Sequence, residues 1–406
     1  MELSKDLLRY YGNKYVLLYN YYTNKICLIK KHVLDLLEQG NMNEFKMCEE
    51  EWEVLVRKGI VISNQDEYRS MSYRNKYQEQ IKSRNFKIET VYFHVTQRCN
   101  LQCEYCYNKN NLNKREELTT EEVFRVIDIL KKANVKNIIL TGGEALLRKD
   151  IVEIAQYIKQ EGFSLTVLTN GVLLGAKSRI LKYIDSSIIS IDTLDAQKNL
   201  RKGLDIDALI KNLKEIEHSL RSKIYLRCVI SKQDMDSWKS IKEFCKQNNY
   251  KFLKSIYIPG SKDEIELVPT VEGVNDNEES SENTTNMGGS VCGASYKEIA
   301  IDANGDVYPC QMLISKQWKL GNIFEGNYPI RQNQPEIIEL FKRRNLSTIS
   351  SCNICEYKYL CGGGCPAISY YLYKDTEVAP SVACDFIKAE IDVKMVRMLK
   401  EYEEKF

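Results

Sequence analysis

VYFHVTQRCNLQCEYCY, at residues 91–107, joins a strand-like apolar run to three cysteines on one short loop. Cys99, Cys103 and Cys106 are separated by three and then two residues. Three thiolates at this spacing can hold three irons of a [4Fe–4S] cluster and leave the fourth iron open to a substrate or cofactor. A three-cysteine zinc site is the alternative, but zinc prefers four closed ligands and only His94 lies nearby to complete one.

Beyond this loop, strand-like and helical stretches alternate as far as residue 258. The expected strands are 91–95, 137–141, 164–169, 187–192, 224–230 and 251–258. The expected helices are 119–133, 150–161, 177–184, 206–219 and 237–247. This alternation predicts an α/β fold with a parallel sheet, either doubly wound or a partial barrel. In both architectures the functional groups lie at the carboxyl ends of the strands.

A second motif, Thr141-Gly142-Gly143-Glu144, ends the second expected strand. Together with the cysteine loop it resembles the radical S-adenosylmethionine (radical SAM) enzymes, which carry a GGE motif at this place. The resemblance implies that Gly142, Gly143 and Glu144 hold the amino group of SAM. Glycines at a strand end also let the backbone approach a ligand closely. The family usually has proline next, where this chain has Ala145.

Further matches follow at later strand ends. Thr169-Asn170-Gly171 resembles the family's TNG, and Ser190 and Asp192 stand where the family places groups near the SAM ribose and carboxylate. Arg201 resembles an arginine that reaches the SAM carboxylate, and Tyr105 is the aromatic residue before the last cysteine of the loop. Each is also compatible with an ordinary strand-end cap. The resemblance covers about 90–258 and implies a partial (β/α)6 TIM-like barrel.

Seven more cysteines crowd the C-terminal part of the chain, around a GDVYPC sequence that ends at Cys310. Their order resembles the SPASM signature, which implies two auxiliary clusters and therefore three [4Fe–4S] clusters in all. By position, the first auxiliary cluster takes Cys292, Cys310 and Cys365, and the second takes Cys352, Cys355, Cys361 and Cys384. A zinc ribbon built from Cys352, Cys355, Cys361 and Cys365 is the alternative, but it leaves three aligned cysteines unexplained.

Residues 1–65 are expected to form a separate unit. Strand-like runs at 14–20 and 25–30 predict a hairpin, and helical patterns follow at 32–39 and 43–58. This order resembles the PqqD-like winged helix that binds leaders of ribosomally made precursor peptides, which implies β-augmentation at the hairpin edge. A DNA-binding winged helix is the alternative, but the helix at 43–58 carries five glutamates against three basic residues.

The other expected boundaries follow from composition. Polar stretches predict linkers, or in the first case an exposed helix, at 66–88 and 261–290. They flank a radical SAM core at 89–260 and precede a SPASM domain at 291–406, in which 385–405 is expected to form a closing helix.

Charge and hydropathy exclude two classes of partner. The 58 Lys+Arg and 56 Asp+Glu residues leave a net charge of +2, which excludes a strongly basic nucleic-acid binder or anionic-membrane binder. No apolar run approaches the ~18 residues of a membrane span, and the N-terminus lacks the core of a signal peptide. We therefore expect a cytoplasmic protein, in which clustered cysteines hold metal. The isolated Cys27, Cys48, Cys228 and Cys245 are expected to be small buried hydrophobes.

These resemblances imply a peptide-modifying radical SAM enzyme of the sactipeptide or ranthipeptide type, with a flavodoxin or ferredoxin as electron donor. Cleavage of SAM would give a 5′-deoxyadenosyl radical that abstracts hydrogen from a precursor peptide. The first auxiliary cluster has three assigned cysteines, and residues 246–291 contain no fourth one. A substrate thiolate on the open iron would favour a thioether product.

Other functions stay open at this point. The open iron is equally compatible with water or another side chain and a role in electron relay alone. A carbon–carbon crosslink is a further outcome of the same chemistry. An anaerobic sulfatase maturase would carry an aspartate directly after the GDVYPC cysteine, where this chain has Gln311. The rival from another class is a non-catalytic iron–sulfur carrier or peptide scaffold.

Overall fold

The computed structural model describes residues 2–40, 49–113, 117–271, 292–325 and 335–406. The predictions for Cys48, for the start of the helix at 43–58 and for most of the linker at 261–290 lie outside these residues. At the centre, six parallel strands pair in the order β13-β12-β10-β9-β8-β6. They are β6 (Thr90–Thr96), β8 (Asn137–Gly142), β9 (Ser164–Thr169), β10 (Ser186–Ser190), β12 (Ile224–Ile230) and β13 (Lys251–Ile256). The predicted α/β fold with six parallel strands is confirmed.

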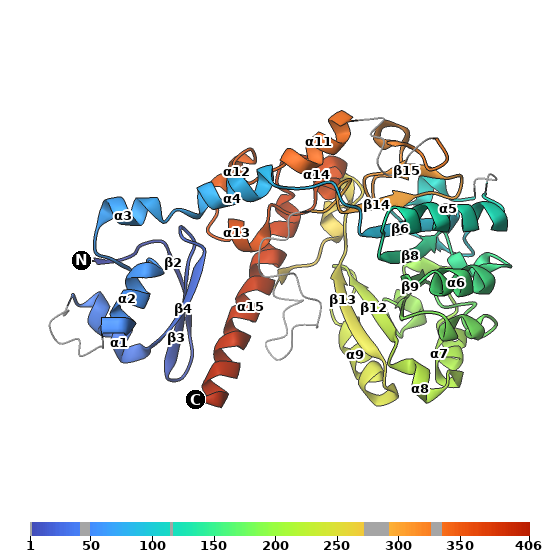
Figure 1. Cartoon of the computed structure of the whole chain (residues 1–406). Helices are drawn as coiled ribbons and strands as arrows, with labels where there is room; N and C mark the ends of the chain where they lie inside the picture. Colours follow the sequence, from blue (N-terminus) through green and yellow to red (C-terminus); the bar gives the residue numbers. More distant parts are fainter. Residues whose placement is uncertain (1, 41–48, 114–116, 272–291, 326–334) are drawn as a thin grey trace.

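Helices cover one face of this sheet (Figure 1). They are α5 (Thr120–Lys132), α6 (Ile151–Gln160), α7 (Ile206–Glu215), α8 (His218–Arg221) and α9 (Ser237–Asn248). Thr119 and Glu122 form a reciprocal capping box that starts α5. Two helix predictions need correction. The segment 177–184 holds only a five-residue 3-10 helix, η4 (Ser178–Lys182), and the helix expected at 206–219 is interrupted at the extended Ile216.

Side chains alternate between the two faces of the sheet. Those that face the helices form the main core. Five of them are at most 1% exposed, namely Phe93, Leu140, Val167, Ile189 and Leu226. Because side chains alternate along a strand, their neighbours project from the opposite face, which we call the inner face. Tyr92, His94 and Arg227 lie on it.

The sheet continues into the cysteine-rich part of the chain. Strand β14 (Glu298–Ile301) pairs in parallel with β6, and β15 (Asp306–Tyr308) and β16 (Gly321–Asn322) extend it further. Unpaired edges of sheets are unfavourable, so β14 satisfies the backbone groups along β6. The predicted boundary at 291 therefore divides sequence motifs but not the sheet.

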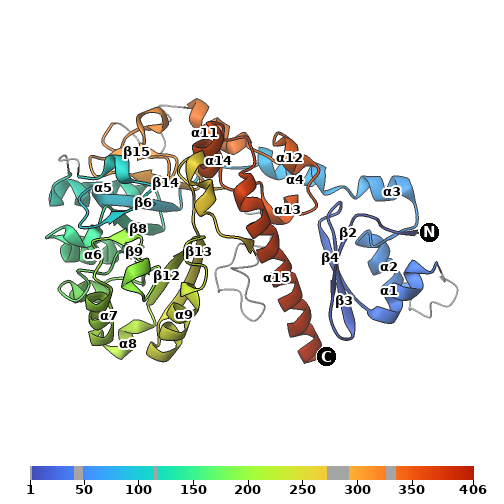
Figure 2. The same ribbon diagram turned by 180° about the vertical axis from the view of Figure 1, so that it is seen from behind.

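The C-terminal helices lead from the cysteine-rich part to the N-terminal unit. They are α11 (Pro335–Arg343), α12 (Ser350–Asn353), α13 (Lys358–Cys361), α14 (Pro366–Tyr373) and α15 (Ser381–Lys405). Figures 1 and 2 show α15, drawn in dark red, running beside the N-terminal sheet. Its start lies four residues before the predicted 385–405. Within the described residues, no helix combines the length and apolar character that crossing a bilayer requires.

The N-terminal sheet has three antiparallel strands, β2 (Leu7–Tyr11), β3 (Tyr15–Asn20) and β4 (Lys25–Lys30). The predicted hairpin is β3–β4, whereas β2 was not predicted. Helices α1 (Lys31–Glu38) and α2 (Glu49–Arg57) cover one face, and β5 (Val61–Ile62) pairs with β1 (Glu2–Leu3). On the other face, residues Tyr10, Leu17 and Tyr19 form one apolar cluster with α15 residues Ile391, Met395 and Leu399.

The expected linker at 66–88 contains two helices, α3 (Gln65–Ser70) and α4 (Tyr73–Lys82). Tyr77 and Ile81 of α4 are buried in an apolar cluster with Leu346 and Ile349. The segment is therefore helical and largely exposed, as one of the two expectations for it had it, but one face of α4 is buried. Two apolar residues four positions apart on one helix face bury that face despite the polar composition around them.

Candidate active site and cysteine sets

The loop that carries Cys99, Cys103 and Cys106 leaves the carboxyl end of β6. Its short strand β7 (Gln102–Cys103) pairs with β11 (Arg201–Lys202), which places Cys103 directly opposite Arg201. The guanidinium Nη1 of Arg201 lies 3.9 Å from the Cys103 sulfur. The structure thus joins the cysteine loop to an arginine almost a hundred residues later, as the predicted site requires.

Gly142 and Gly143 let the end of β8 contact the backbone just before Cys99. The N–H of Gly143 donates to the carbonyl oxygen of Thr96 at 2.9 Å, and the N–H of Glu144 donates to that of Arg98 at 2.8 Å. A Cβ atom on Gly142 would overlap the oxygen of Thr96, and one on Gly143 would overlap the oxygen of Arg98. Gly142 also has a φ of 141°, which side chains disfavour. The glycines thus permit a close backbone approach within the chain.

The carboxylate of Glu144 is 1% exposed and joins β8 to β9. One of its oxygens accepts from the hydroxyl of Thr169 at 2.7 Å and the N–H of Leu146 at 3.0 Å. Its other oxygen accepts from the N–H of Asn170 at 2.7 Å. Burial raises the pKa of Glu144, although these hydrogen bonds oppose the rise. Contact of this carboxylate with the SAM amino group stays a prediction.

Asn170 extends the same connection to the cysteine loop. Its side-chain amide donates to the Asn100 side chain at 2.9 Å, and its oxygen accepts from the N–H of Val172 at 3.0 Å. The predicted GGE and TNG motifs therefore converge beside the cysteine loop. Hydrogen bonds among the three segments hold the loop in one position.

Asp192, Arg201 and Tyr105 form a second buried group. The Nε of Arg201 lies 2.9 Å from one Asp192 oxygen, and Asp192 also accepts from the hydroxyl of Tyr105 and, at 3.1 Å, from the N–H of Val229. The guanidinium lies over the Tyr105 ring at 5.3 Å. Ser190, the remaining predicted residue, lies opposite Arg227 in the register of β10 and β12. The structure thus gathers Tyr105, Asp192 and Arg201, while Ser190 ends β10, two residues before Asp192.

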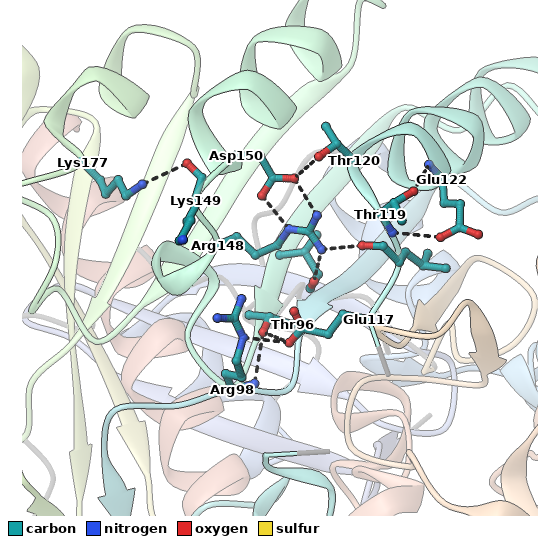
Figure 3. A network of polar contacts seen from close by, with 12 residues as sticks. Thr96, Arg98, Glu117, Thr119, Thr120, Glu122, Arg148, Lys149, Asp150 and Lys177 are labelled. Atoms are coloured by element: carbon teal, nitrogen blue, oxygen red, sulfur yellow. Dashed lines mark hydrogen bonds and ion pairs between the residues drawn. The ribbon is translucent and has the colours of Figure 1, made fainter. Parts of the chain in front are cut away.

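A buried arginine that sequence reasoning missed braces the base of the loop (Figure 3). Arg148 donates to the carbonyl oxygens of Val95 at 3.0 Å and Leu118 at 2.9 Å. Its guanidinium also binds both oxygens of Asp150, at 2.9 and 2.6 Å, and Asp150 accepts from Thr120 at 2.7 Å. A second contact in the same view joins Thr96 and Arg98 to Glu117. The one sequence signal that could have indicated Arg148 is its position shortly after the GGE motif.

The cysteines of each predicted set interact electrostatically with one another, and their binding of iron–sulfur clusters stays a prediction. Charge interactions link Cys99, Cys103 and Cys106 to one another, and a second set links Cys292, Cys310 and Cys365. The third set comprises Cys352, Cys355, Cys361 and Cys384. Burial raises the pKa of the Cys99, Cys103 and Cys106 thiols, and a coordinating metal ion reverses such an effect by deprotonating the thiol. Cys27, Cys228 and Cys245 are buried as predicted.

Arg344 tests whether the last two sets suit anionic clusters. It is 2% exposed and donates to the carbonyl oxygens of Thr376 at 2.8 Å and Gly363 at 2.8 Å. No ion pair with a carboxylate involves it within the described part of the chain. The groups whose negative charge would act on it favourably are Cys292, Cys365, Cys352 and Tyr77, which include cysteines of both sets. A buried cation needs a counter-charge, and thiolate-bound iron–sulfur clusters carry one. The cysteine thiolates of these two sets therefore suit such clusters as ligands.

Two other observations concern metal sites and orphaned polar groups. Across the described ranges, no three His, Cys, Asp or Glu side chains are grouped so that they could hold a metal ion as they stand. His94 is fully buried on the inner face of β6, and both of its ring nitrogens lack a hydrogen-bond partner there. Burial lowers the pKa of His94 to about 3, so this imidazole is neutral.

Family models match both halves of this arrangement. The model of the radical SAM superfamily matches residues 93–245, and that of the SPASM iron–sulfur cluster-binding domain matches residues 292–356. This chain carries a radical SAM domain and a SPASM domain. The two matched segments contain Cys99, Cys103, Cys106, Cys292, Cys310, Cys352 and Cys355.

Several curated relatives match parts of this chain. The probable GTP 3′,8-cyclase of Pyrococcus abyssi is 33% identical over 171 residues, which cover 41% of this chain and 56% of that protein. This chain thus spans about half the length of that relative. The mycofactocin maturase MftC of Mycolicibacterium smegmatis is 24% identical, covering 68% of this chain and 78% of that protein. The subtilosin biosynthesis protein AlbA of Bacillus subtilis is 25% identical, covering 67% and 66%.

Solved structures share the fold over most of the chain. Streptococcus suis SuiB bound to S-adenosylmethionine is 19% identical with a TM-score of 0.55, covering 93% of this chain and 98% of SuiB. The structure of anSMEcpe with bound AdoMet and the Cp18Cys peptide is 16% identical with a TM-score of 0.57, covering 78% of this chain and 99% of that one. These likenesses confirm the TIM-like α/β radical SAM fold.

Proposed function

We propose that this protein is a radical SAM enzyme that modifies a ribosomally made precursor peptide and forms a thioether between a cysteine sulfur and a carbon. The observation that carries the proposal is the contact between the loop of Cys106 and the loop of Cys310. Tyr107 follows the former cysteine and Gln311 follows the latter, and the Tyr107 hydroxyl donates to the Gln311 side chain at 3.3 Å. A substrate between these loops would face both cysteine sets.

The names of several relatives support a peptide substrate. AlbA is a biosynthesis protein of the antilisterial bacteriocin subtilosin, and MftC is a maturase of mycofactocin. SuiB has been solved with its precursor peptide SuiA. We extend this class of substrate to the present chain because the two cysteine-bearing loops of its site meet at Tyr107 and Gln311.

The residues of the site have separate roles in this proposal. Cys99, Cys103 and Cys106 would hold the SAM-binding cluster, and the other two sets would hold the auxiliary clusters. Such a cluster, when bound, supplies the reductive cleavage of SAM to a 5′-deoxyadenosyl radical. Arg201 and Asp192 orient polar groups of SAM, and Tyr105 covers them. Gly142, Gly143, Glu144 and Asn170 fix the loop that positions the cofactor.

The thioether rests on the ligands of the Cys292 set. Cys245 does not supply a fourth thiolate, because it is 2% exposed in the core between α9 and the sheet and its thiol lies 3.7 Å from the carbonyl oxygen of Lys251. A place therefore remains for the sulfur of a substrate cysteine. A carboxylate of this chain that could compete for the place is that of Glu298, which is half-buried and whose charge acts on Cys292, Cys310 and Cys365.

The N-terminal unit is proposed to bind the leader of the precursor. Strand β2 covers one side of β3, so among the described strands β4 has an unpaired edge, at which the Lys58 side chain already donates to the carbonyl oxygen of Ile26 at 2.8 Å. The N–H of Lys31 donates to the carbonyl oxygen of Lys14. Because hydrogen-bonded and non-hydrogen-bonded pairs alternate along an antiparallel hairpin, this bond shows that the backbone groups of Ile26, Leu28 and Lys30 point away from β3, toward that edge. A leader would add there as a further strand. A flavodoxin or ferredoxin would supply the electrons.

Mass spectrometry of the modified peptide tests the function. The enzyme, with its clusters reconstituted anaerobically, is incubated with SAM, reductant and the precursor encoded beside its gene. A thioether should remove two hydrogens per linkage and protect one cysteine from alkylation. Loss of two hydrogens with every cysteine still alkylated would indicate a carbon–carbon or carbon–oxygen crosslink. An unmodified peptide would contradict the peptide-modifying function itself.

A further inference from the structure

Arg227 occupies the middle of β12 and projects from the inner face of the sheet. In the strand register it lies opposite Ser190 of β10 on one side and Leu253 of β13 on the other. The Nε of its guanidinium group is buried and has no hydrogen-bond partner in the described part of the chain. A cation placed in this way is unfavourable unless something else balances it.

Three other arginines of the described residues, each more deeply buried than the half-buried Arg227, interact with acidic groups. Arg148 binds Asp150 and Arg201 binds Asp192. Arg344 lies beside two cysteine sets that suit anionic clusters. Arg227, in contrast, takes part in no ion pair among the described residues, and its electrically interacting neighbours are Tyr92, Tyr107 and the like-charged Arg201.

The position of Arg227 relates it to the substrate and not to the cluster ligands. Tyr107 connects the Cys106 loop to Gln311, and Tyr92 interacts with the Cys292 and Cys310 charges. Arg227 therefore faces the region between the catalytic loop and the first auxiliary set. The arginine whose charge acts on Cys103 and Cys106 is Arg201, which lies nearer the expected place of SAM.

We propose that Arg227 binds a carboxylate of the substrate peptide, the side chain of an aspartate or glutamate close to the modified residue. This inference rests on the proposed peptide-modifying function. The planar guanidinium presents paired donors that match a carboxylate, and the partial burial of Arg227 strengthens such a bond. The tyrosines that surround Arg227 carry no charge at neutral pH, so they leave its charge for the ligand.

The test compares a carboxylate with its amide at the same site. The probes are N-acetyl-glutamate amide and N-acetyl-glutamine amide, which are titrated into the cluster-loaded full chain in the presence of SAM. The wild type should bind the glutamate probe at least about tenfold more tightly, as expected for a hydrogen bond between charged groups. Arg227→Gln should lose this preference while keeping its iron content and its affinity for SAM. Arg179→Gln, on an exposed residue of η4, is the control and should keep the preference.

Arg227→Lys retains the charge without the paired donors, so it should keep the preference at lower affinity, and it carries the test if Arg227→Gln does not fold. Equal binding of both probes by the wild type would overturn the proposal. An unchanged preference for the glutamate probe in Arg227→Gln would also overturn it. If Arg227→Gln lost its affinity for SAM and kept the preference, Arg227 would be assigned to the SAM carboxylate and the proposal would be wrong. Because these titrations need no turnover, a negative result in them would contradict the role of Arg227 without contradicting the proposed function. Once the precursor peptide is known, its aspartates and glutamates can be replaced one at a time by asparagine or glutamine. At one position the replacement should raise the KM of the wild-type enzyme but should not change the KM of Arg227→Gln.

Discussion

The Glu144 carboxylate accepts a hydrogen bond of 2.7 Å from the backbone N–H of Asn170. This bond connects the end of β8 to the end of β9, and Asn170 in turn holds Asn100 beside Cys99. The GGE and TNG motifs are thus parts of one hydrogen-bonded unit. Its first task in this chain is to position the cysteine loop, and any contact with SAM depends on that.

Glu144→Gln should therefore weaken the site before it changes any chemistry. An amide placed here cannot accept from all three donors, so at least one buried N–H or hydroxyl loses its partner, which costs about 1–3 kcal/mol. We expect a lower midpoint in urea unfolding and weaker SAM binding by calorimetry. Glu153→Gln, an exposed substitution on α6, is the control. An unchanged unfolding midpoint with weaker SAM binding would instead make Glu144 a direct SAM ligand only.

The Arg148–Asp150 pair should make stability depend on acid pH. Burial alone would raise the pKa of Asp150, but hydrogen bonds from Arg148 and Thr120 and the charge of Arg148 lower it. Because the folded pKa is lowered, the stabilisation is present above the unfolded pKa near 3.9 and disappears as the pH falls through the folded value.

In Asp150→Asn, the free energy of unfolding should decrease less than in the wild type as the pH falls. The substitution should also cost about 3 kcal/mol at neutral pH, because Arg148 would remain buried without its partner. Urea titrations between about pH 3 and pH 7 measure both effects. A variant with the wild-type slope would show that other carboxyl groups cause the acid sensitivity.

Much of this organisation was predictable because it is periodic or local. Strands that alternate with helices and polar residues at strand ends can be read from the chain, and the cysteine spacings divide into three sets. Contacts between distant segments could not be predicted. Arg148 meets the oxygens of Val95 and Leu118 at separations of 53 and 30 residues, and β14 pairs with a strand about two hundred positions earlier. Arg344 and Arg227 carry no local pattern at all, since their burial depends on the whole fold.

The three cysteine sets predict three clusters that can be removed one at a time. The reconstituted protein should hold about twelve irons, and Cys103→Ser, Cys310→Ser and Cys361→Ser should each lower that number by about four. Iron and sulfide analysis, with electron paramagnetic resonance of each variant, measures this. Cys228→Ser, in the core, is the matched control and should keep every iron. A protein that holds zinc through the Cys352 set would contradict the second auxiliary assignment.

The role of the N-terminal unit is best tested at the edge of β4. Deletion of 1–65 should block peptide modification, but it would also uncover the face of α15 that packs on Tyr10, Leu17 and Tyr19. Lys30→Pro is cleaner, because Lys30 has a φ of −69°, which proline adopts, and its N–H faces the open edge. It should weaken leader binding about tenfold and leave SAM cleavage unchanged, whereas Lys30→Ala keeps the N–H and should bind normally. Equal leader affinity in both variants would exclude strand addition at this position.

The central claim is that Cys99, Cys103 and Cys106 direct radical chemistry at a peptide. The most direct measurement is the isotope content of 5′-deoxyadenosine formed when the reconstituted enzyme turns over with SAM and a precursor peptide deuterated at carbon. We predict deuterium in the 5′-deoxyadenosine of the wild type, and no 5′-deoxyadenosine from Cys103→Ala, whose auxiliary clusters should remain. Unlabelled 5′-deoxyadenosine from the wild type, or continued formation by Cys103→Ala, would contradict the account.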